Sequence, residues 1–265
     1  MATLVSFHAH PDDESIQTGG TLARAAAAGH RVVLVFATRG EHGEVADGFL
    51  DDEEHLAQRR EKETLASADV LGVQRVEFLG YHDSGMMGTP ENDLPDAFWQ
   101  AGVDEAAERL ARILVEEGAD VLTVYDSDGG YGHPDHIQVH RVGVRAAELA
   151  GTPRVYEATM NRDHLRRIME EAVAAGAIPR EEVPDVTQES TFGRPESALT
   201  TAVDVRGHLA QKRASMAAHA SQIGEDSFFL AMPDEAFEAT FGTEWFIRHG
   251  EPGGLRETDL LEGLT

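Results

Sequence analysis

Residues 4–15 have the sequence Leu-Val-Ser-Phe-His-Ala-His-Pro-Asp-Asp-Glu-Ser. The apolar run at 4–7 predicts a short buried strand, which ends by Pro11. One imidazole and three carboxylates then fall within five positions, at His10, Asp12, Asp13 and Glu14. Charges at the end of a core strand are costly to bury unless a cation or a reaction uses them. The stretch therefore predicts the first strand of a sheet and a functional site at its carboxyl end.

The chain continues as alternating strands and helices. Helices are predicted at 16–28, 53–71, 103–117 and 134–150, and further strands at 31–37, 75–79, 119–125 and 154–159. This alternation predicts an α/β fold, a Rossmann-like and mostly parallel sheet with helices on both faces. Such winding places strands one and four side by side, strands two and three on one flank and strand five on the other. Ligands then bind where the strand order reverses.

The alternation loosens beyond residue 160. We predict a helix at 162–175, an irregular stretch at 176–198, a strand at 202–205, a helix at 207–221 and a last strand or short helix at 244–248. The chain is predicted to form a single domain over 1–265, with a Rossmann-like core at 1–159 and a smaller, irregular cap and tail at 160–265. The final dozen residues are expected to be a disordered or subunit-contacting tail.

Composition narrows the function classes. The chain has 265 residues, enough for a large core, and a formal net charge of -26, which argues against nucleic acid and anionic membranes as partners. It has no cysteine, so a metal site must use His, Asp or Glu. The sequence contains neither a signal-like N-terminus nor an apolar window long enough to span a bilayer, which predicts a cytoplasmic protein.

A second stretch repeats the pattern of the first, with a strand, a turn, a proline, an acid and an imidazole. Residues 131–136 have the sequence Tyr-Gly-His-Pro-Asp-His. His10 and Asp13 lie three positions apart across a turn, and His136 begins a helix after the neighbouring strand. These three residues are predicted to bind one metal ion with an open position, as in catalytic zinc sites. The alternative is a pair of strand-end turns with ordinary capping acids.

Four other side chains are predicted to act in catalysis. Asp12 is the candidate general base for water, against the alternative of a helix N-cap acid. His133 is expected at the rim, too far to bind the same ion easily, where it stabilises an oxyanion or protonates a leaving amine. Asp135 is expected to hold the His133 ring in one tautomer. Tyr131 is expected to point its hydroxyl at the oxyanion.

Weaker signals receive structural interpretations. Glu14 is interpreted as a first-turn helix acid and His219 as a capped, buried histidine. Arg60 and Glu63, one helical turn apart, are expected to form an exposed pair of little energetic worth. Residues 83–85, Asp-Ser-Gly, are predicted to form a turn.

The motifs Ala-His-Pro-Asp-Asp-Glu at 9–14 and His-Pro-Asp-His at 133–136 resemble those of the LmbE-like (PIG-L) zinc-dependent N-deacetylases. Further matches are Arg60 with Glu63, residues 83–86, and the segment from Lys212 to Gln222. The resemblance covers nearly the whole chain to about residue 225. It implies zinc on the three predicted ligands, Asp12 as base, His133 as its electrostatic or acid partner and Tyr131 on the amide carbonyl. It also implies that Arg60 and Asp83 contact the sugar.

The sequence thus predicts a metal-dependent amidohydrolase that removes an N-acyl group from an N-acetylglucosaminyl-type amino sugar. We expect one Zn²⁺ per chain, with another divalent metal as an alternative. The predicted partner is a small amino-sugar conjugate, with a homo-oligomer as a further option. Two alternatives are an amidase of larger, mycothiol S-conjugate type substrates and a non-catalytic sugar- or nucleotide-binding domain.

Overall fold

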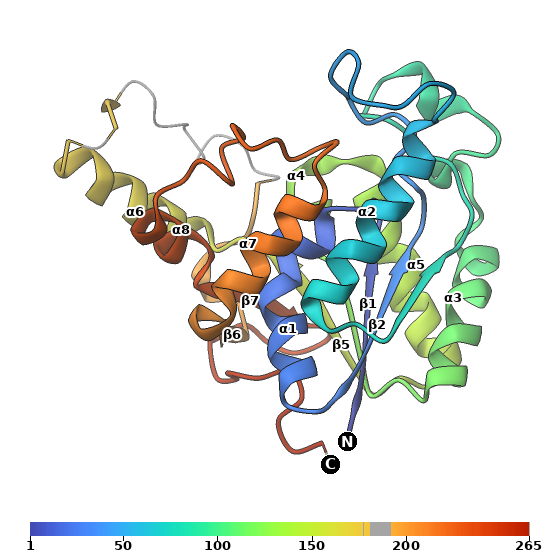
Figure 1. The fold of residues 1–265 in the computed structure, drawn as a ribbon. Coiled ribbons are helices and arrows are strands. Elements are labelled where there is room, and N and C mark those ends of the chain that lie inside the picture. Colours follow the sequence, from blue (N-terminus) through green and yellow to red (C-terminus); the bar gives the residue numbers. More distant parts are fainter. Residues whose placement is uncertain (177, 181–191, 265) are drawn as a thin grey trace.

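One seven-stranded sheet organises the protein in the computed structural model, which describes residues 1–176, 178–180 and 192–264 (Figure 1). Its five parallel strands are β1 (Thr3–His8), β2 (Arg31–Phe36), β3 (Arg75–Phe78), β4 (Val121–Tyr125) and β5 (Arg154–Thr159). Their order, β3-β2-β1-β4-β5, confirms the predicted winding. Val5 of β1 pairs with Val33 of β2 and with Leu122 of β4. The first strand therefore lies in the interior of the sheet, with a parallel neighbour on each side.

Two antiparallel strands extend the sheet beyond β5. They are β6 (Thr201–Asp204) and β7 (Thr243–Arg248), and the order continues β5-β7-β6. Phe246 of β7 pairs with Ala158 of β5 on one side and with Thr201 of β6 on the other. Both strands lie within the region predicted as an irregular cap. That region therefore contributes to the central sheet, and the division at residue 159 stays a prediction.

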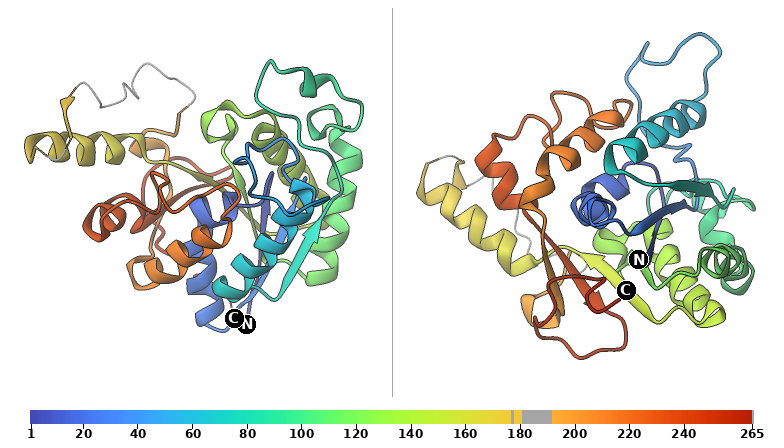
Figure 2. Two further views of the ribbon diagram at one scale, coloured as in Figure 1. Left: turned by 45° about the horizontal axis from the view of Figure 1, so that its top comes forward. Right: turned by 60° about the horizontal axis from the view of Figure 1, so that its bottom comes forward.

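Helices cover both faces of the sheet, as predicted (Figure 2). Helices α3 (Val103–Glu117) and α5 (Pro134–Ala150) pack on one face, and α1 (Gly19–Ala27) and α2 (Leu56–Leu71) on the other. Helix α7 (Leu209–Ala218) lies against α1 and α2. The shorter α4 (Gly129–Gly132) follows β4, and α6 (Arg162–Ala174) and α8 (Asp234–Phe241) belong to the C-terminal part. Within the described residues, no helix is both long and apolar enough to cross a membrane.

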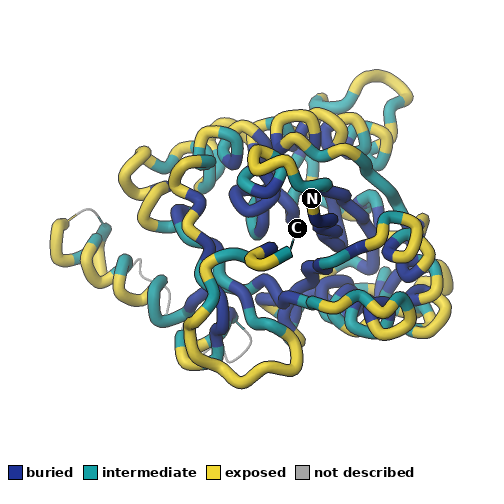
Figure 3. The backbone as a smooth tube through the Cα atoms, turned by 90° about the horizontal axis from the view of Figure 1, so that it is seen from below, coloured by how far each residue is buried: buried dark blue, intermediate teal, exposed yellow. Residues whose placement is uncertain are grey.

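The alternating side chains of the central strand supply both halves of the core. Val5 and Phe7 point into the cluster that α3 and α5 cover, whereas Leu4 points into the cluster that α1 and α2 cover. All three side chains are fully buried. Figure 3 shows the buried residues gathered in the interior of the molecule, with the exposed residues around its periphery.

A buried ion pair joins the C-terminal strands to the first helix. The Lys212 ammonium of α7 is fully buried and lies 2.5 Å from Glu244 Oε1 at the start of β7. The Glu244 carboxylate also accepts hydrogen bonds from the backbone N–H groups of Gly20 and Thr21, both at 2.8 Å. Because a buried charge needs partners of this kind, the pair fixes α1, α7 and β7 relative to one another.

Part of the last described segment packs on the core, so the expected disorder is wrong for it, whereas a contact of the tail with another subunit stays a prediction. Leu260 and Leu261 are buried in the same cluster as Ala2 and Leu4. The Arg154 guanidinium also donates a hydrogen bond to the Glu262 carbonyl at 2.8 Å. Two consecutive leucines supply the apolar area that holds this segment down.

Candidate active site

The two histidine motifs meet at the carboxyl ends of β1 and β4. His10 follows β1, and His133 and His136 lie at the beginning of α5 behind β4. The ring of His10 lies 4.7 Å from that of His133 and 5.4 Å from that of His136, between centroids. All three imidazoles are buried, and each offers a nitrogen within 4.8 Å of the others. The fold thus brings together the motifs at the predicted switch point.

Asp13 stands at the distance from each of the two predicted histidine ligands that a shared tetrahedral ion would require. Asp13 Oδ2 lies 3.4 Å from His10 Nδ1 and 3.4 Å from His136 Nε2. Two ligand atoms at ~2.0–2.1 Å from one zinc ion, with a tetrahedral angle between them, stand about 3.3 Å apart. The Asp13 carboxylate is therefore placed to bind the same ion as either histidine.

His136 is oriented as a ligand by its surroundings. Its ring stacks on Tyr125, with centroids 4.1 Å apart, and its Nδ1 lies 3.1 Å from the Gly129 carbonyl oxygen. Donation from Nδ1 to that carbonyl leaves the lone pair on Nε2. Nε2 is buried and has no hydrogen-bond partner among the described residues. A buried nitrogen in this state fits a metal ion, because leaving it unpaired is costly.

The far side of the His10 ring contacts two acids. Nε2 lies 3.1 Å from Asp135 Oδ2 and 3.5 Å from Asp83 Oδ1. Burial lowers the pKa of His10, but the carboxylates of Asp83, Asp13 and Asp135 together raise it well above its usual value. A carboxylate on one imidazole nitrogen commonly directs the other nitrogen to a metal. This arrangement leaves Nδ1 facing Asp13.

The prediction that the Asp135 side chain holds the His133 ring is wrong. Its fully buried carboxylate meets His10 and accepts hydrogen bonds from the backbone N–H and the hydroxyl of Ser84, not from His133. Position 135 is in the first turn of α5, so its side chain turns back toward the loop after β3. Sequence reasoning missed Ser84, because the Asp-Ser-Gly stretch signalled only a turn.

A second group of possible ligands, His10 with Asp83 and Asp135, also lies within 4.8 Å. Hydrogen bonds already satisfy its two acids. Asp83 accepts from the backbone N–H groups of Gly85 at 2.8 Å and His42 at 3.2 Å, and Asp135 is bonded to Ser84. The group is explained as support for the His10 ring. Contact of Asp83 with a sugar stays a prediction.

His133 lies closer to the ligands than predicted, because the turn before α5 directs its ring inward. Its Nδ1 accepts a hydrogen bond from the Asp135 backbone N–H at 3.1 Å, which caps the helix. Burial lowers the pKa of His133 to about 2, and the rings of His10 and His136 lower it as well. The ring is therefore neutral, with its proton on Nε2. In that tautomer its Nε2–H is a hydrogen-bond donor toward the site.

Asp12 has a strained backbone, with φ of 104°, a region that L-residues seldom enter. Two side chains hold it there. Its N–H donates to Glu14 Oε2 at 2.9 Å, and its Oδ2 lies 3.3 Å from the Arg60 guanidinium. Burial raises the pKa of the Asp12 carboxyl to about 6, against the opposing effect of Arg60. A carboxyl of this pKa suits a general base near neutral pH.

We expect the Asp12→Gly variant to be more stable than Asp12→Ala, with a free energy of unfolding about 1 kcal/mol larger. The reason is that glycine adopts a positive φ without the Cβ penalty. At an ordinary position glycine would be the less stable of the two. Urea denaturation of both variants in the presence of a chelator measures the difference. Alanine equal to or more stable than glycine would show that Asp12 is not strained.

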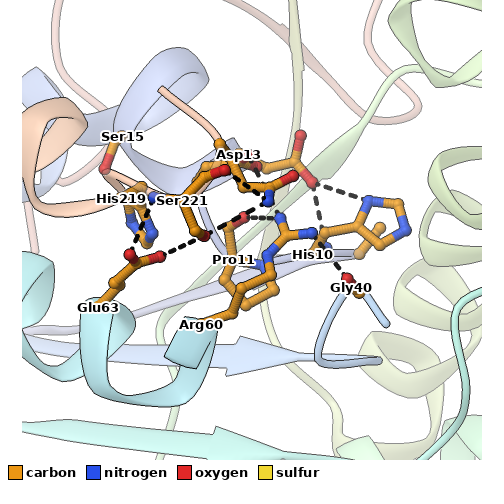
Figure 4. A network of polar contacts seen from close by, with 12 residues as sticks. His10, Pro11, Asp13, Ser15, Gly40, Arg60, Glu63, His219 and Ser221 are labelled. Carbon is orange, nitrogen blue, oxygen red and sulfur yellow. Dashed lines mark hydrogen bonds and ion pairs between the residues drawn. The ribbon is translucent and has the colours of Figure 1, made fainter. Parts of the chain in front are cut away.

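Arg60 and Glu63 form no exposed pair, and that prediction is wrong. Both are buried, because α2 turns this face toward α7 and the first motif. The Arg60 guanidinium donates to the Gly40 carbonyl at 2.9 Å and to the Pro11 carbonyl, whereas Glu63 accepts from the Ser221 hydroxyl at 2.6 Å (Figure 4). The contacts of Arg60 in the structure are with the protein itself, and its sugar contact stays a prediction.

Glu14 lies in the first turn of a short helix, as predicted, but it is also fully buried and has partners that the sequence did not indicate. Its side chain is fully buried and lies 2.6 Å from Nε2 of His219, which is buried as predicted. Burial raises the pKa of Glu14, but His219 lowers it to about 2 overall. Burial likewise lowers the pKa of His219, and Glu14 raises it above the usual value. The two therefore form an ion pair. The only sequence signal was a third acid directly after two others.

Tyr131 is the most open of the predicted residues, with 45% of its surface exposed. It lies in α4, and its ring centroid is 5.0 Å from that of His136. Burial raises the pKa of its hydroxyl, which stays protonated and able to donate. The turn before it needs glycine, since Gly129 has φ of 68° and a Cβ there would stand 2.7 Å from the His136 Cβ.

Comparison with known proteins agrees with this geometry. Residues 5–147 match the family model described as GlcNAc-PI de-N-acetylase (PIG-L). The chain is 41% identical over 279 residues to a 1D-myo-inositol 2-acetamido-2-deoxy-alpha-D-glucopyranoside deacetylase of Acidothermus cellulolyticus, covering all of this chain and 96% of the relative. A protein of the same name from Streptomyces avermitilis is 42% identical over 292 residues, covering 98% of this chain and 97% of the relative.

A solved structure shares the fold. The N,N'-diacetylchitobiose deacetylase of Pyrococcus horikoshii superposes with a TM-score of 0.55 at 21% identity, covering 89% of this chain and 73% of that one. At that identity the likeness concerns the fold alone, so the chemistry has to be argued from the side chains.

Proposed function

The chain belongs to the GlcNAc-PI de-N-acetylase (PIG-L) family, and from that premise we propose that it hydrolyses the acetamide of an amino sugar to a free amine and acetate. The observation that carries the proposal is the Asp13 carboxylate, 3.4 Å from both His10 Nδ1 and His136 Nε2, with Asp12 beside it. Such a set has room for water and substrate.

His10, Asp13 and His136 are proposed to hold the metal, with one Zn²⁺ per chain as the first choice and another divalent ion as the alternative. When bound, the ion supplies a Lewis acid for the acyl oxygen and lowers the pKa of water. Full-length relatives whose names specify the acetamide of a glucopyranoside support this reaction class. His136 Nε2 supports the ligand set, because it has no hydrogen-bond partner among the described residues and lies 3.4 Å from Asp13 Oδ2.

The chain's own groups account for the proton transfers. Asp12 accepts a proton from the attacking water. Tyr131 donates a hydrogen bond to the acyl oxygen as negative charge develops on it. The C–N bond then breaks as the leaving nitrogen takes up the proton that Asp12 accepted from water, which leaves Asp12 ionised again. The Nε2–H of the neutral His133 ring is the candidate donor of a hydrogen bond to the developing oxyanion, and the acetic acid released loses its proton to solvent.

We propose a small glucosaminyl conjugate as substrate, of the inositol-linked kind named for the relatives. A homo-oligomer and a cytoplasmic location stay predictions. The C-terminal part, with α6 and α8 outside the main helical layers (Figure 1), is proposed to set the choice of aglycone. That proposal retains the predicted difference between a core and a specificity region.

The proposal is tested by measuring amine release from a panel of substrates, with and without a chelator. The panel contains N-acetylglucosamine, diacetylchitobiose, the inositol glycoside of N-acetylglucosamine and a larger thioether conjugate amide. We expect hydrolysis of the inositol glycoside, its loss on chelation and its return with Zn²⁺. Preference for the thioether conjugate would favour the amidase alternative. Tight sugar binding without amine release under any metal would identify a binding domain.

A further inference from the structure

We propose that Glu14 is a positioning residue for Asp12 and that His219 keeps Glu14 in place. This inference rests on the proposed function in one respect, the role of Asp12 as base. The observation is a buried carboxylate that accepts the N–H of the strained Asp12 peptide on one oxygen and three side-chain donors, two of them from other helices, on the second.

The two carboxylate oxygens of Glu14 accept hydrogen bonds from different groups. Oε2 accepts the N–H of Asp12 at 2.9 Å. Oε1 lies 2.6 Å from the hydroxyl of Ser67 on α2, 2.9 Å from that of Ser15 and 2.6 Å from His219 Nε2. One oxygen therefore anchors the carboxylate in the packed interior, and the other is aimed at the backbone next to the metal ligands.

His219 supplies a buried hydrogen-bond donor to the Glu14 carboxylate. It ends α7, is fully buried and places Nε2 against Glu14 Oε1. Because α7 packs on α1 and α2, the ring cannot move without disturbing those helices. A residue more than two hundred positions along the chain thus fixes the acid beside the first motif.

Arg60 holds the same peptide from the other side. Its guanidinium donates to the Pro11 carbonyl (Figure 4). It also contacts Asp12 Oδ2 at 3.3 Å. The peptide unit of Pro11 and Asp12 is therefore held at its carbonyl by Arg60 and at its N–H by Glu14. A peptide fixed at both ends keeps φ of Asp12 at 104° and sets the direction of its carboxylate.

Glu14→Gln tests the proposal with almost no change of volume. Glutamine has one acceptor oxygen, so it cannot accept both the Asp12 N–H and the donors on the opposite side. We expect kcat on the acetamide substrate to fall about 10²-fold, as for a base displaced by about 1 Å, with KM and bound metal little changed. Equal falls in metal content and kcat would overturn the proposal.

Glu244→Gln is the matched control. Glu244 is also a buried carboxylate with a buried cation on one side and backbone N–H groups on both oxygens, but it does not contact the site. We expect a similar loss of thermal stability and an unchanged kcat for the folded fraction. If Glu14→Gln lowers kcat no more than Glu244→Gln does, Glu14 is only structural.

The variants His219→Gln and His219→Ala distinguish the hydrogen bond that His219 donates to Glu14 from the packing of its ring. The glutamine amide nitrogen stands as many bonds from Cα as the His219 Nε2 that meets Glu14, so it can donate to the same oxygen. We expect His219→Gln to retain a higher kcat than His219→Ala. Equal kcat values would show that this donor does not matter.

A stability cycle keeps the inference distinct from the proposed function. Glu14→Gln, Asp12→Gly and the double variant are unfolded in urea with a chelator present. Because both changes act on one peptide, their effects are expected not to add. Additive effects would overturn the positioning role. Non-additive effects in a protein that releases no amine would leave the positioning role standing and remove the proposed function.

Discussion

His136→Ala is expected to lose the bound metal and the hydrolytic activity together. The imidazole is fully buried, and apart from the 3.4 Å contact with Asp13 Oδ2 its Nε2 has no hydrogen-bond partner among the described residues. Its removal leaves two of three ligands and a cavity in which water replaces the ring. Metal content after exhaustive dialysis, measured beside amine release, checks both losses. Activity should fall to that of the chelator-treated wild type.

His140→Ala provides the control on the same helix. His140 lies one turn further along α5, and its Nδ1 is 3.0 Å from the Tyr125 carbonyl oxygen, away from the three ligands. This variant should keep its metal and its turnover. A His136→Ala protein with a full complement of metal would refute the ligand set, whatever its activity.

Asp12→Asn is expected to keep the metal and to lose roughly 10²–10⁴-fold in kcat, the range that a positioned acid–base group contributes. Asparagine has the same shape and tolerates positive φ, so the fold should survive. It cannot accept the proton of water. Steady-state kinetics with metal analysis of the same sample separate loss of the base from loss of the ion.

Asp120→Asn is the matching control, since Asp120 accepts the Thr3 N–H at 2.8 Å at the opposite end of β1. It should reduce stability without lowering kcat. Near-normal turnover in Asp12→Asn would mean that another group takes the proton of water, and the proposed role of Asp12 would have to be abandoned.

The parallel half of the fold was predictable because each of its strands is an apolar run bounded by a recognisable stop. Winding rules then fix the order, and the two His-Pro-Asp motifs fall at the switch point. Strands β6 and β7 gave a weaker signal. They are partly exposed, and Thr243–Arg248 pairs with β5 and β6 across long sequence separations. Local patterns carry no information about such partners.

The residues of the candidate site likewise divide into those that could be placed from the sequence and those that could not. Residues that project from the ends of β1 and β4 could be placed from sequence, because strand ends converge in space. Asp135, Arg60 and Glu14 could not, because their contacts depend on how helices pack around the motif. A buried arginine that bonds to backbone carbonyls looks in sequence like any surface arginine. The structural support of the first motif is therefore where prediction from sequence failed.

The place of β7 between β5 and β6 has a consequence for biosynthesis. While the ribosome adds the residues between Thr159 and Thr243, the outer edge of β5 has no partner. At ~5–20 residues per second this interval is on the order of ten seconds. An open edge of that kind invites pairing with other nascent chains, so aggregation during translation should depend on how fast this stretch is made.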